Sequence, residues 1–184
     1  MLGNTETNWG PVAKALHWLL ALLILGQFVL GRIAVQAAVS PRKLDLFVGH
    51  KSLGLSILLF VVLRIAWRMS TTAPACLAAN AWERRLAQVG HALLYLLMVA
   101  VPLSGWWVSD TSRIPFKLFW TVPVPDLMAA NRDISEIAGE VHESLTTLLL
   151  VVVGVHVLAA LRHHFVLRNA TLTRMLPFRR QPER

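Results

Sequence analysis

Four long runs of mostly apolar residues dominate this chain, at residues 12–33, 47–67, 86–108 and 141–165. A helix of about 20 apolar residues is long enough to cross the hydrocarbon core of a bilayer. The 184 residues are 55% hydrophobic and have a mean hydropathy of +0.56, a composition typical of membrane proteins rather than of small soluble domains. The sequence therefore predicts an all-α fold, an integral membrane four-helix bundle, formed by a single domain over residues 1–184.

Prolines and turn residues mark the connections between these runs. The first two connections lie near residues 40–43 and 71–74, and the third covers residues 109–140. We expect the third connection to hold a short helix at the membrane surface, at residues 125–131. The first run lacks a small-residue cleavage site, so we expect it to remain as a helix and not to be removed as a signal peptide.

The Lys and Arg residues indicate how the bundle is oriented. With the N-terminus inside the cell, most of them fall on the inner side, whereas most Asp and Glu residues fall on the outer side. Because cytoplasmic loops are enriched in Lys and Arg, both termini are predicted to be cytoplasmic. The net charge of +8 comes from basic residues scattered around membrane spans. Membrane lipid is therefore the predicted partner of this charge, and nucleic acid is not.

Four histidines lie inside or at the edges of the apolar runs: His17, His50, His142 and His156. Ionisable side chains are costly inside a membrane and are usually functional there. His142 and His156 are 14 residues apart, which puts them about 21 Å apart along one helix and on nearly the same face. By depth, His50 matches His142 near the outer surface, and His17 matches His156 near the inner surface. This spacing predicts two stacked haems, each with its iron held between two histidines.

Histidine at both axial positions suits electron transfer, because no position on the iron is left open for oxygen. The chain has one cysteine, Cys76, and no Cys-x-x-Cys-His motif, so the haems are predicted to be held without covalent bonds. Small residues that let a porphyrin approach the backbone are Gly49, Gly54 and Gly154. Candidate cations for the haem propionates are Arg64 and Arg68 at the inner haem and Lys51 or Arg42 at the outer haem.

Three other histidines leave alternatives open. His91 lies near the inner end of the third run and competes by depth with His17 and His156 as a ligand. His163 and His164 lie at the inner end of the fourth run, where a solvated basic cluster is the usual explanation. His163 nevertheless follows His156 by seven residues and lies on the same face. Both are therefore candidate catalytic residues, as proton donors to a quinone near the inner haem.

Short motifs around the four paired histidines resemble those of the bacterial cytochrome b561 family. They are Lys14-Ala15-Leu16-His17-Trp18, Gly49-His50, His142-Glu143 and Gly154-Val155-His156. The tail, Arg162-His163-His164-Phe165 followed by residues 171–177, is similar in particular to the small di-haem superoxide oxidases of this family, which are superoxide:ubiquinone oxidoreductases. The resemblance spans nearly the whole chain.

The resemblance implies a multi-pass cytochrome b561-type domain in the bacterial inner membrane, with two non-covalent haem b groups. It implies that His17 and His156 bind the inner iron and that His50 and His142 bind the outer iron, and it leaves His91 unligated. The implied reaction oxidises periplasmic superoxide to oxygen and reduces ubiquinone. Cations on the outer side would attract the superoxide anion. The candidates are Arg42, Lys43, Arg113, Lys117 and Arg132.

Related four-helix cytochromes act instead as membrane anchors and electron conduits for a partner dehydrogenase or hydrogenase. Such a subunit needs a docking surface for its redox partner and is inert toward superoxide by itself. The short connections and the lack of room for a further domain lead us to expect the self-contained oxidoreductase. A third reading, a haem-free transport or scaffold protein, would leave the matched histidines unexplained.

Overall fold

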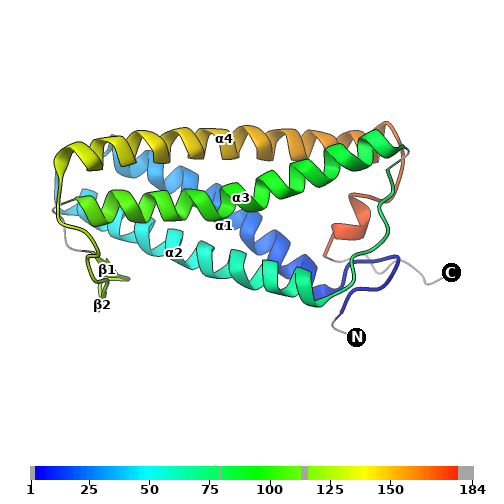
Figure 1. Cartoon of the computed structure of the whole chain (residues 1–184), viewed down its shortest axis with the longest axis horizontal. Helices are drawn as coiled ribbons and strands as arrows, with labels where there is room; N and C mark the ends of the chain where they lie inside the picture. Colours follow the sequence, from blue (N-terminus) through cyan, green and yellow to red (C-terminus); the bar gives the residue numbers. More distant parts are fainter. Residues whose placement is uncertain (1–2, 79, 113–115, 178–184) are drawn as a thin grey trace.

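The computed structural model describes residues 3–78, 80–112 and 116–177, and within these residues the chain forms four long helices. They are α1 (Pro11–Gln36), α2 (Pro41–Ser70), α3 (Ala81–Thr111) and α4 (Arg132–Phe165). All four are long and apolar enough to cross a membrane, and they form a bundle (Figure 1). The predicted all-α membrane bundle is confirmed, and each helix extends beyond its apolar run at one or both ends.

Capping residues explain where the helices begin. Ser40, Asn80 and Asn131 each accept a hydrogen bond from the backbone N–H three residues further on, at the start of α2, α3 and α4. Such N-caps satisfy donors that the first turn of a helix otherwise leaves free. α1 has no side-chain cap and begins at Pro11, whose fixed backbone angle suits the first position of a helix.

The two ends of the bundle carry different connections. α1 begins and α4 ends at one end, which we call the terminal end, while the α1–α2 and α3–α4 connections lie at the opposite, hairpin end (Figure 1). The terminal end corresponds to the inner side, and the hairpin end to the outer side, of the orientation expected from the sequence. The cytoplasmic location of the terminal end stays a prediction.

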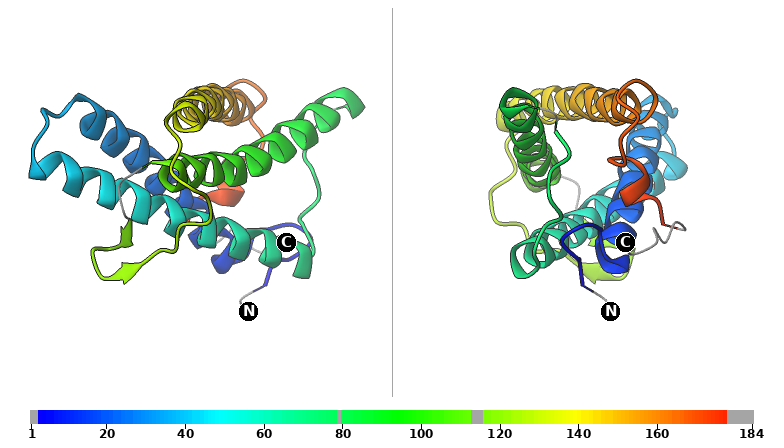
Figure 2. Two further views of the ribbon diagram at one scale, coloured as in Figure 1. Left: turned by 60° about the vertical axis from the view of Figure 1, so that its left-hand side comes forward. Right: turned by 90° about the vertical axis from the view of Figure 1, so that its right-hand side faces the viewer.

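The helices pack in sequence order, α1 on α2, α2 on α3 and α3 on α4 (Figure 2). Two apolar clusters hold them together midway along the bundle. Leu20, Ile57 and Val61 form the cluster between α1 and α2. Leu94, Leu97 and Leu149 form the cluster between α3 and α4, and Ile24 and Met98 pack against both. Because lipid is as apolar as these side chains, close packing rather than the hydrophobic effect stabilises this layer.

The α3–α4 connection differs from the expectation for it. The predicted short helix at residues 125–131 is wrong: this part of the connection is described and is not helical. An antiparallel hairpin of β1 (Lys117–Leu118) and β2 (Val122–Pro123) precedes it. The backbone N–H groups of Leu127 and Asn131 donate to α3, to Asp110 Oδ1 at 2.7 Å and to Thr111 O at 3.1 Å. These donors are therefore satisfied by tertiary contacts and not by a local helix.

The hairpin is fastened to the start of α2. The backbone N–H of Phe119 donates to the buried hydroxyl of Ser52 at 2.8 Å, and the Trp120 indole N–H donates to Asp45 Oδ1 at 3.0 Å. Phe116, at 6% exposure, lies just before β1. The connection thus folds back over the hairpin end of the bundle.

Segments before α1 and after α4 close the terminal end. The Asn4 side-chain amide donates to Thr71 Oγ1 at 3.1 Å, just after α2. On the other side, the Trp18 indole N–H of α1 donates to Met175 O at 2.8 Å. Met175 ends η1, a short 3₁₀ helix at Thr173–Met175, which lies beside the start of α1 (Figure 2).

Candidate functional site

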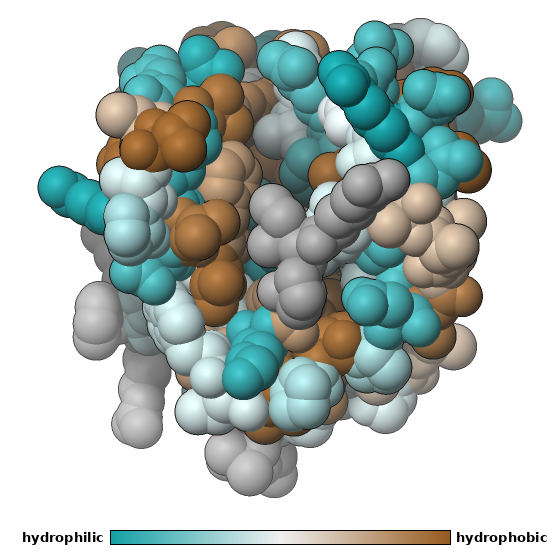
Figure 3. All heavy atoms as spheres, turned by 90° about the vertical axis from the view of Figure 1, so that its left-hand side faces the viewer, coloured by the Kyte–Doolittle hydropathy of each residue, from teal (hydrophilic) through white to brown (hydrophobic). Residues whose placement is uncertain are grey.

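At the hairpin end, His50 of α2 and His142 of α4 face each other across the bundle. Their ring centroids are 6.4 Å apart, and the ring planes are inclined by 85°. Both rings line a cavity of about 370 Å³, within the range of small-molecule and cofactor sites. Seen from this end, the surface is hollowed between the helices, with both hydrophilic and hydrophobic residues around the hollow (Figure 3). The sequence-predicted pair is therefore brought together beside a space that suits a ligand.

The ring of His142 is oriented by α3. Its Nδ1 lies 3.1 Å from the carbonyl oxygen of Val101 and 3.0 Å from Ser104 Oγ. A carbonyl oxygen only accepts, so Nδ1 carries the proton and donates. The other nitrogen, Nε2, is then unprotonated and has its lone pair available to a metal. This is the arrangement found at most metal-binding histidines, whose second nitrogen is tied to an acceptor.

Two glycines lie directly against the rings of this pair. A Cβ atom added to Gly31 of α1 would lie 2.8 Å from His50 Cε1, and one added to Gly105 of α3 would lie 3.0 Å from His142 Cε1. The sequence reasoning missed both. It singled out Gly154, where an added Cβ would meet nothing within 4 Å, and Gly49, where the nearest atom would be 3.8 Å away. It also singled out Gly54, which lines the large cavity and where an added Cβ would lie 3.2 Å from Gln27 Nε2.

At the terminal end, three histidines gather. The ring centroids of His17 on α1 and His156 on α4 are 6.3 Å apart, with planes inclined by 65°. His91 on α3 is 5.6 Å from the same His156 ring. The expected pair, His17 and His156, therefore lies side by side, and His91, the alternative ligand left open by the sequence, lies beside His156 as well.

Ring separation tests whether each pair has room for one metal ion. Two metal–imidazole bonds of about 2.0 Å, added to the radii of the two rings, separate the ring centres by about 6.3 Å. The separations of 6.3 Å for His17 with His156 and 6.4 Å for His50 with His142 match this value. The separation of 5.6 Å for His91 with His156 is shorter. The two sequence-predicted pairs fit an iron between them, and they fit better than the alternative pair.

Arg64 of α2 occupies the terminal-end site. Its guanidinium lies 3.2 Å from His17 Nδ1 and donates to the Tyr95 hydroxyl at 3.3 Å. A guanidinium only donates, so His17 Nδ1 accepts here, the opposite of His142 Nδ1. Coordination of a metal through Nε2 of His17 therefore requires Arg64 to release this ring. The hairpin-end histidine His142 needs no such change.

The other predicted propionate partners lie near the two sites. Arg68 stacks over the Trp9 ring at 5.0 Å and, together with Arg64, lines a smaller cavity of about 80 Å³ at the terminal end. Lys51 lies 5.5 Å from the centre of the Phe116 ring and lines the large cavity at the hairpin end. Each site thus has cations beside it.

One sequence spacing explains how the two sites are built. Each helix carries two of the residues described above, 14 positions apart. They are His17 and Gly31 on α1, His50 and Arg64 on α2, His91 and Gly105 on α3, and His142 and His156 on α4. Fourteen residues return to nearly the same helix face about 21 Å further on. This repeated spacing puts Gly31 and Gly105 at the same depth as His50 and His142.

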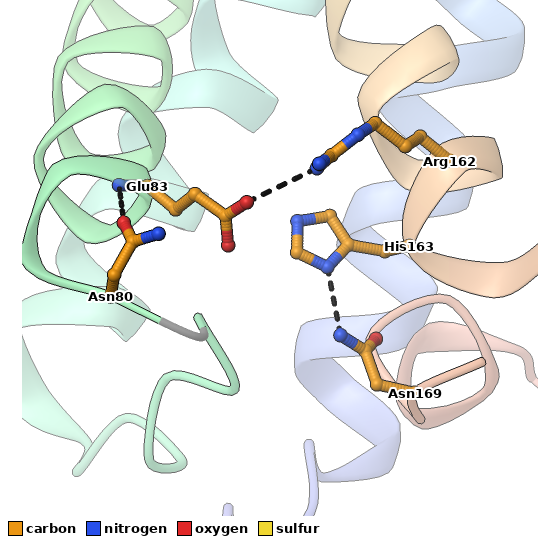
Figure 4. A network of polar contacts seen from close by, with 5 residues as sticks. All are labelled: Asn80, Glu83, Arg162, His163 and Asn169. Atoms are coloured by element: carbon orange, nitrogen blue, oxygen red, sulfur yellow. Dashed lines mark hydrogen bonds and ion pairs between the residues drawn. The ribbon is translucent and has the colours of Figure 1, made fainter. Parts of the chain in front are cut away.

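His163 and His164 end α4 without contacting either histidine pair in the described residues. The Asn169 side-chain amide lies 2.8 Å from His163 Nδ1, and the neighbouring Arg162 pairs with Glu83 of α3 at 3.3 Å. The His163 ring and the Glu83 carboxylate point toward each other across the gap between α3 and α4 (Figure 4). The His164 ring instead lies edge-on to Phe165 at 4.8 Å.

Two of the cations expected to attract superoxide contact other groups of the protein. Lys43 Nζ donates to the backbone carbonyls of Val35 and Ala37 at 3.2 and 2.9 Å, where it caps the end of α1. Arg132 pairs with Glu136 at 2.9 Å. Arg113 lies outside the described residues. Among the described residues, the charged side chains that line the large cavity are Arg32, Lys51 and Glu143.

Histidines that face one another at two levels of a four-helix membrane bundle define a class of protein, the b-type membrane cytochromes. In such proteins cofactors lie between facing helices and are held by axial side-chain ligands.

Comparison with known proteins identifies the family within this class. The family model described as prokaryotic cytochrome b561 matches residues 8–178, and the chain belongs to this family. It is 33% identical to cytochrome b561 homolog 2 of Escherichia coli, over 94% of this chain and 93% of that protein. It is 32% identical to the probable superoxide oxidase CybB of Yersinia pestis, over 90% and 93% of the two chains. Cytochrome b562 of Cereibacter sphaeroides is 26% identical over 93% and 96%.

Family membership confirms several expectations. The chain is a multi-pass protein of the bacterial inner membrane that takes part in electron transfer, and its family binds haem b. The predicted resemblance to the cytochrome b561 family is therefore confirmed.

Proposed function

We propose that this protein carries electrons across the inner membrane through two haem b groups, taking them from periplasmic superoxide and giving them to ubiquinone. The observation that carries the proposal is the presence of two facing histidine pairs, 6.3 and 6.4 Å between ring centroids, at opposite ends of one bundle. The similarity to a probable superoxide oxidase, at 32% identity over 90% of this chain, supports superoxide as the electron donor.

In this proposal, His50 and His142 hold the outer haem, and His17 and His156 hold the inner haem. Each haem supplies one-electron redox chemistry, and ligation on both faces keeps oxygen off the iron. His142 is already held with Nε2 available for coordination. His91 stays unligated in this proposal, because its ring centroid lies 5.6 Å from that of His156, less than the separation of about 6.3 Å expected for an iron in line between two imidazoles.

The reaction balances with one electron from each superoxide. Two superoxide anions lose one electron each and leave as two molecules of oxygen, and one ubiquinone takes up the two electrons and two protons to become ubiquinol. Because superoxide is an anion, Lys51 and Arg32 beside the large cavity raise its local concentration. Of the two cations that line the cavity within the described residues, Lys51 is half-buried and Arg32 is exposed.

Protons for the quinone come from the terminal end in this scheme. His163 and His164 are the proposed donors, and we favour His163, whose ring points toward the Glu83 carboxylate (Figure 4). Arg64 and Arg68 hold the propionates of the inner haem. Arg64 reaches this role when it leaves His17 Nδ1. Both termini are cytoplasmic, which puts these groups on the side that supplies protons.

A quinone-reduction assay tests this function. Purified protein in liposomes with ubiquinone is supplied with enzymatically generated superoxide, and ubiquinol formation is followed with and without superoxide dismutase. The expected result is ubiquinol formation that the dismutase abolishes. Lys51→Ala should lower kcat/KM for superoxide several-fold, and more at low than at high salt. The matched control is Arg85→Ala, an exposed cation of α3 at the terminal end. Equal rates in both variants would contradict the proposed role of Lys51.

A second candidate function is that of an electron conduit for a partner dehydrogenase or hydrogenase. Exposed apolar side chains on the α3–α4 connection favour it, because such patches often mark docking surfaces. Phe119, Trp120 and Leu127 are 49%, 51% and 69% exposed. In that case the haems would be reduced by the partner protein and would not respond to superoxide.

A further inference from the structure

We propose that Gly31 and Gly105 are positioning residues for the outer haem, because each lets the ring of one ligand histidine rest directly on the backbone of a neighbouring helix. This inference rests on the proposed ligation by His50 and His142. It adds that the two imidazoles are held in place by helices that carry no ligand at this end.

The contact at Gly31 is the closer of the two. A Cβ atom there would lie 2.8 Å from Cε1 and 3.1 Å from Nδ1 of His50. Carbon atoms in contact prefer about 3.5 Å or more, so an alanine methyl would push the His50 ring away from α1 by about 0.7 Å. A metal–nitrogen bond does not tolerate a displacement of this size without lengthening or tilting.

α1 holds His50 through a second residue on the same face. Gln27 lies one helical turn before Gly31, and its side-chain amide donates to the His50 carbonyl oxygen at 2.7 Å. The His50 backbone is thus tied to α1 close to the point where its ring touches Gly31. The ring has little freedom to swing aside when a methyl group is added.

The contact at Gly105 follows the same plan on α3. A Cβ atom there would lie 3.0 Å from Cε1 and 3.3 Å from Nδ1 of His142. The same ring donates from Nδ1 to Val101 O at 3.1 Å, one turn earlier on α3. A methyl group at Gly105 would therefore push the ring by about 0.5 Å and strain the hydrogen bond that sets its protonation.

Glycine and histidine alternate around the bundle at the hairpin end. Gly31 on α1 supports His50 on α2, and Gly105 on α3 supports His142 on α4. At the terminal end, the residues 14 positions away on α1 and α3 are His17 and His91, so the same two helices offer histidines there and not glycines. The effect of these glycines should therefore be confined to the outer haem.

Other glycines of the same helices provide matched controls. Gly26 on α1 and Gly90 on α3 have nothing within 4 Å of an added Cβ. Alanine at any of the four positions favours the helical backbone by up to about 1 kcal/mol. The four variants thus share their effect on helix propensity and differ in the contact with a ligand ring.

The experiment compares Gly31→Ala and Gly105→Ala with Gly26→Ala and Gly90→Ala as purified full-length proteins. Haem per chain is measured, and the low-spin signals of the two haems are resolved by electron paramagnetic resonance, with His142→Ala and His156→Ala as references for each haem alone. The expected result is that Gly31→Ala and Gly105→Ala lose up to one of two haems per chain, or keep both haems with a shifted outer signal. The inner signal and both controls stay unchanged.

Two results would overturn the inference. One is that Gly31→Ala and Gly105→Ala keep two haems with unchanged signals. The other is that they lose both haems to the same extent, which would make the glycines general packing residues. A wild-type protein that lacks two haems would instead refute the proposed function on which the inference rests.

Discussion

Replacement of His142 by alanine should remove the outer haem and leave the inner haem in place. His142 and His156 lie 14 positions apart on α4, which separates the two sites by about 21 Å along the helix axis. The apolar layer that contains Leu97 and Leu149 lies between them. Sites this far apart, without shared side chains, behave almost independently. Haem content should therefore fall from two to one per chain in His142→Ala and to zero when His156→Ala is added.

The size of the effect on the remaining haem follows from the same separation. An oxidised haem with two neutral ligands carries one net positive charge on its iron–porphyrin core. At about 21 Å and an effective dielectric constant of about 20, this charge contributes about 0.8 kcal/mol to the energy of the other haem. For one electron that equals about 35 mV. Loss of the outer haem in His142→Ala should thus lower the midpoint potential of the inner haem by no more than about 35 mV.

The assay combines haem quantification with a spectroscopic redox titration. His156→Ala is the reciprocal variant, and it should retain the outer haem alone. Equal loss of both haems in either variant would refute the pairing of His142 with His50. A potential shift several times larger than about 35 mV would refute the idea that the two sites are separated by a packed layer.

Three further substitutions have definite expected outcomes. Ser104→Ala should lower the free energy of unfolding by about 1 kcal/mol but keep two haems, because Val101 O still accepts from His142 Nδ1. Loss of the outer haem on quantification would show that the hydroxyl is essential. His163→Ala should keep both haems and slow ubiquinone reduction, with His164→Ala as the comparison. An unchanged rate of ubiquinone reduction would show that His163 does not supply protons to the quinone. His91→Ala should leave haem content at two per chain, whereas disappearance of the inner low-spin signal would identify His91 as a ligand.

The helices and the histidine pairs could be predicted from the sequence, because both follow from the lengths of the apolar runs and the positions of the histidines along them. An apolar run must span the bilayer, and this fixes the depth of each residue along it. Depth then predicted which histidines lie at the same level, and the structure brings His17 to His156 and His50 to His142. Depth could not separate His91 from His17, because both lie at the level of His156.

Contacts that depend on the distance between neighbouring helices could not be predicted from the sequence. Whether Gly31 or Gly154 touches a histidine depends on how closely two helices approach, and no pattern within one helix contains that distance. The hairpin was missed because Phe119 and Trp120 occupy its left-handed positions, with φ of 46° and 62°, where glycine or asparagine is the usual signal. The contact of Arg64 with His17 was missed because Arg64 was assigned to a propionate.

The central claim is that electrons from superoxide reach quinone through two haems of this one chain. Rapid mixing of the purified protein with superoxide, with haem absorbance recorded before and after ubiquinone is added, tests it most directly. We predict two haems per chain, both reduced by superoxide and both reoxidised by ubiquinone. Two haems that stay oxidised in superoxide would contradict it and would favour the electron conduit that needs a partner protein.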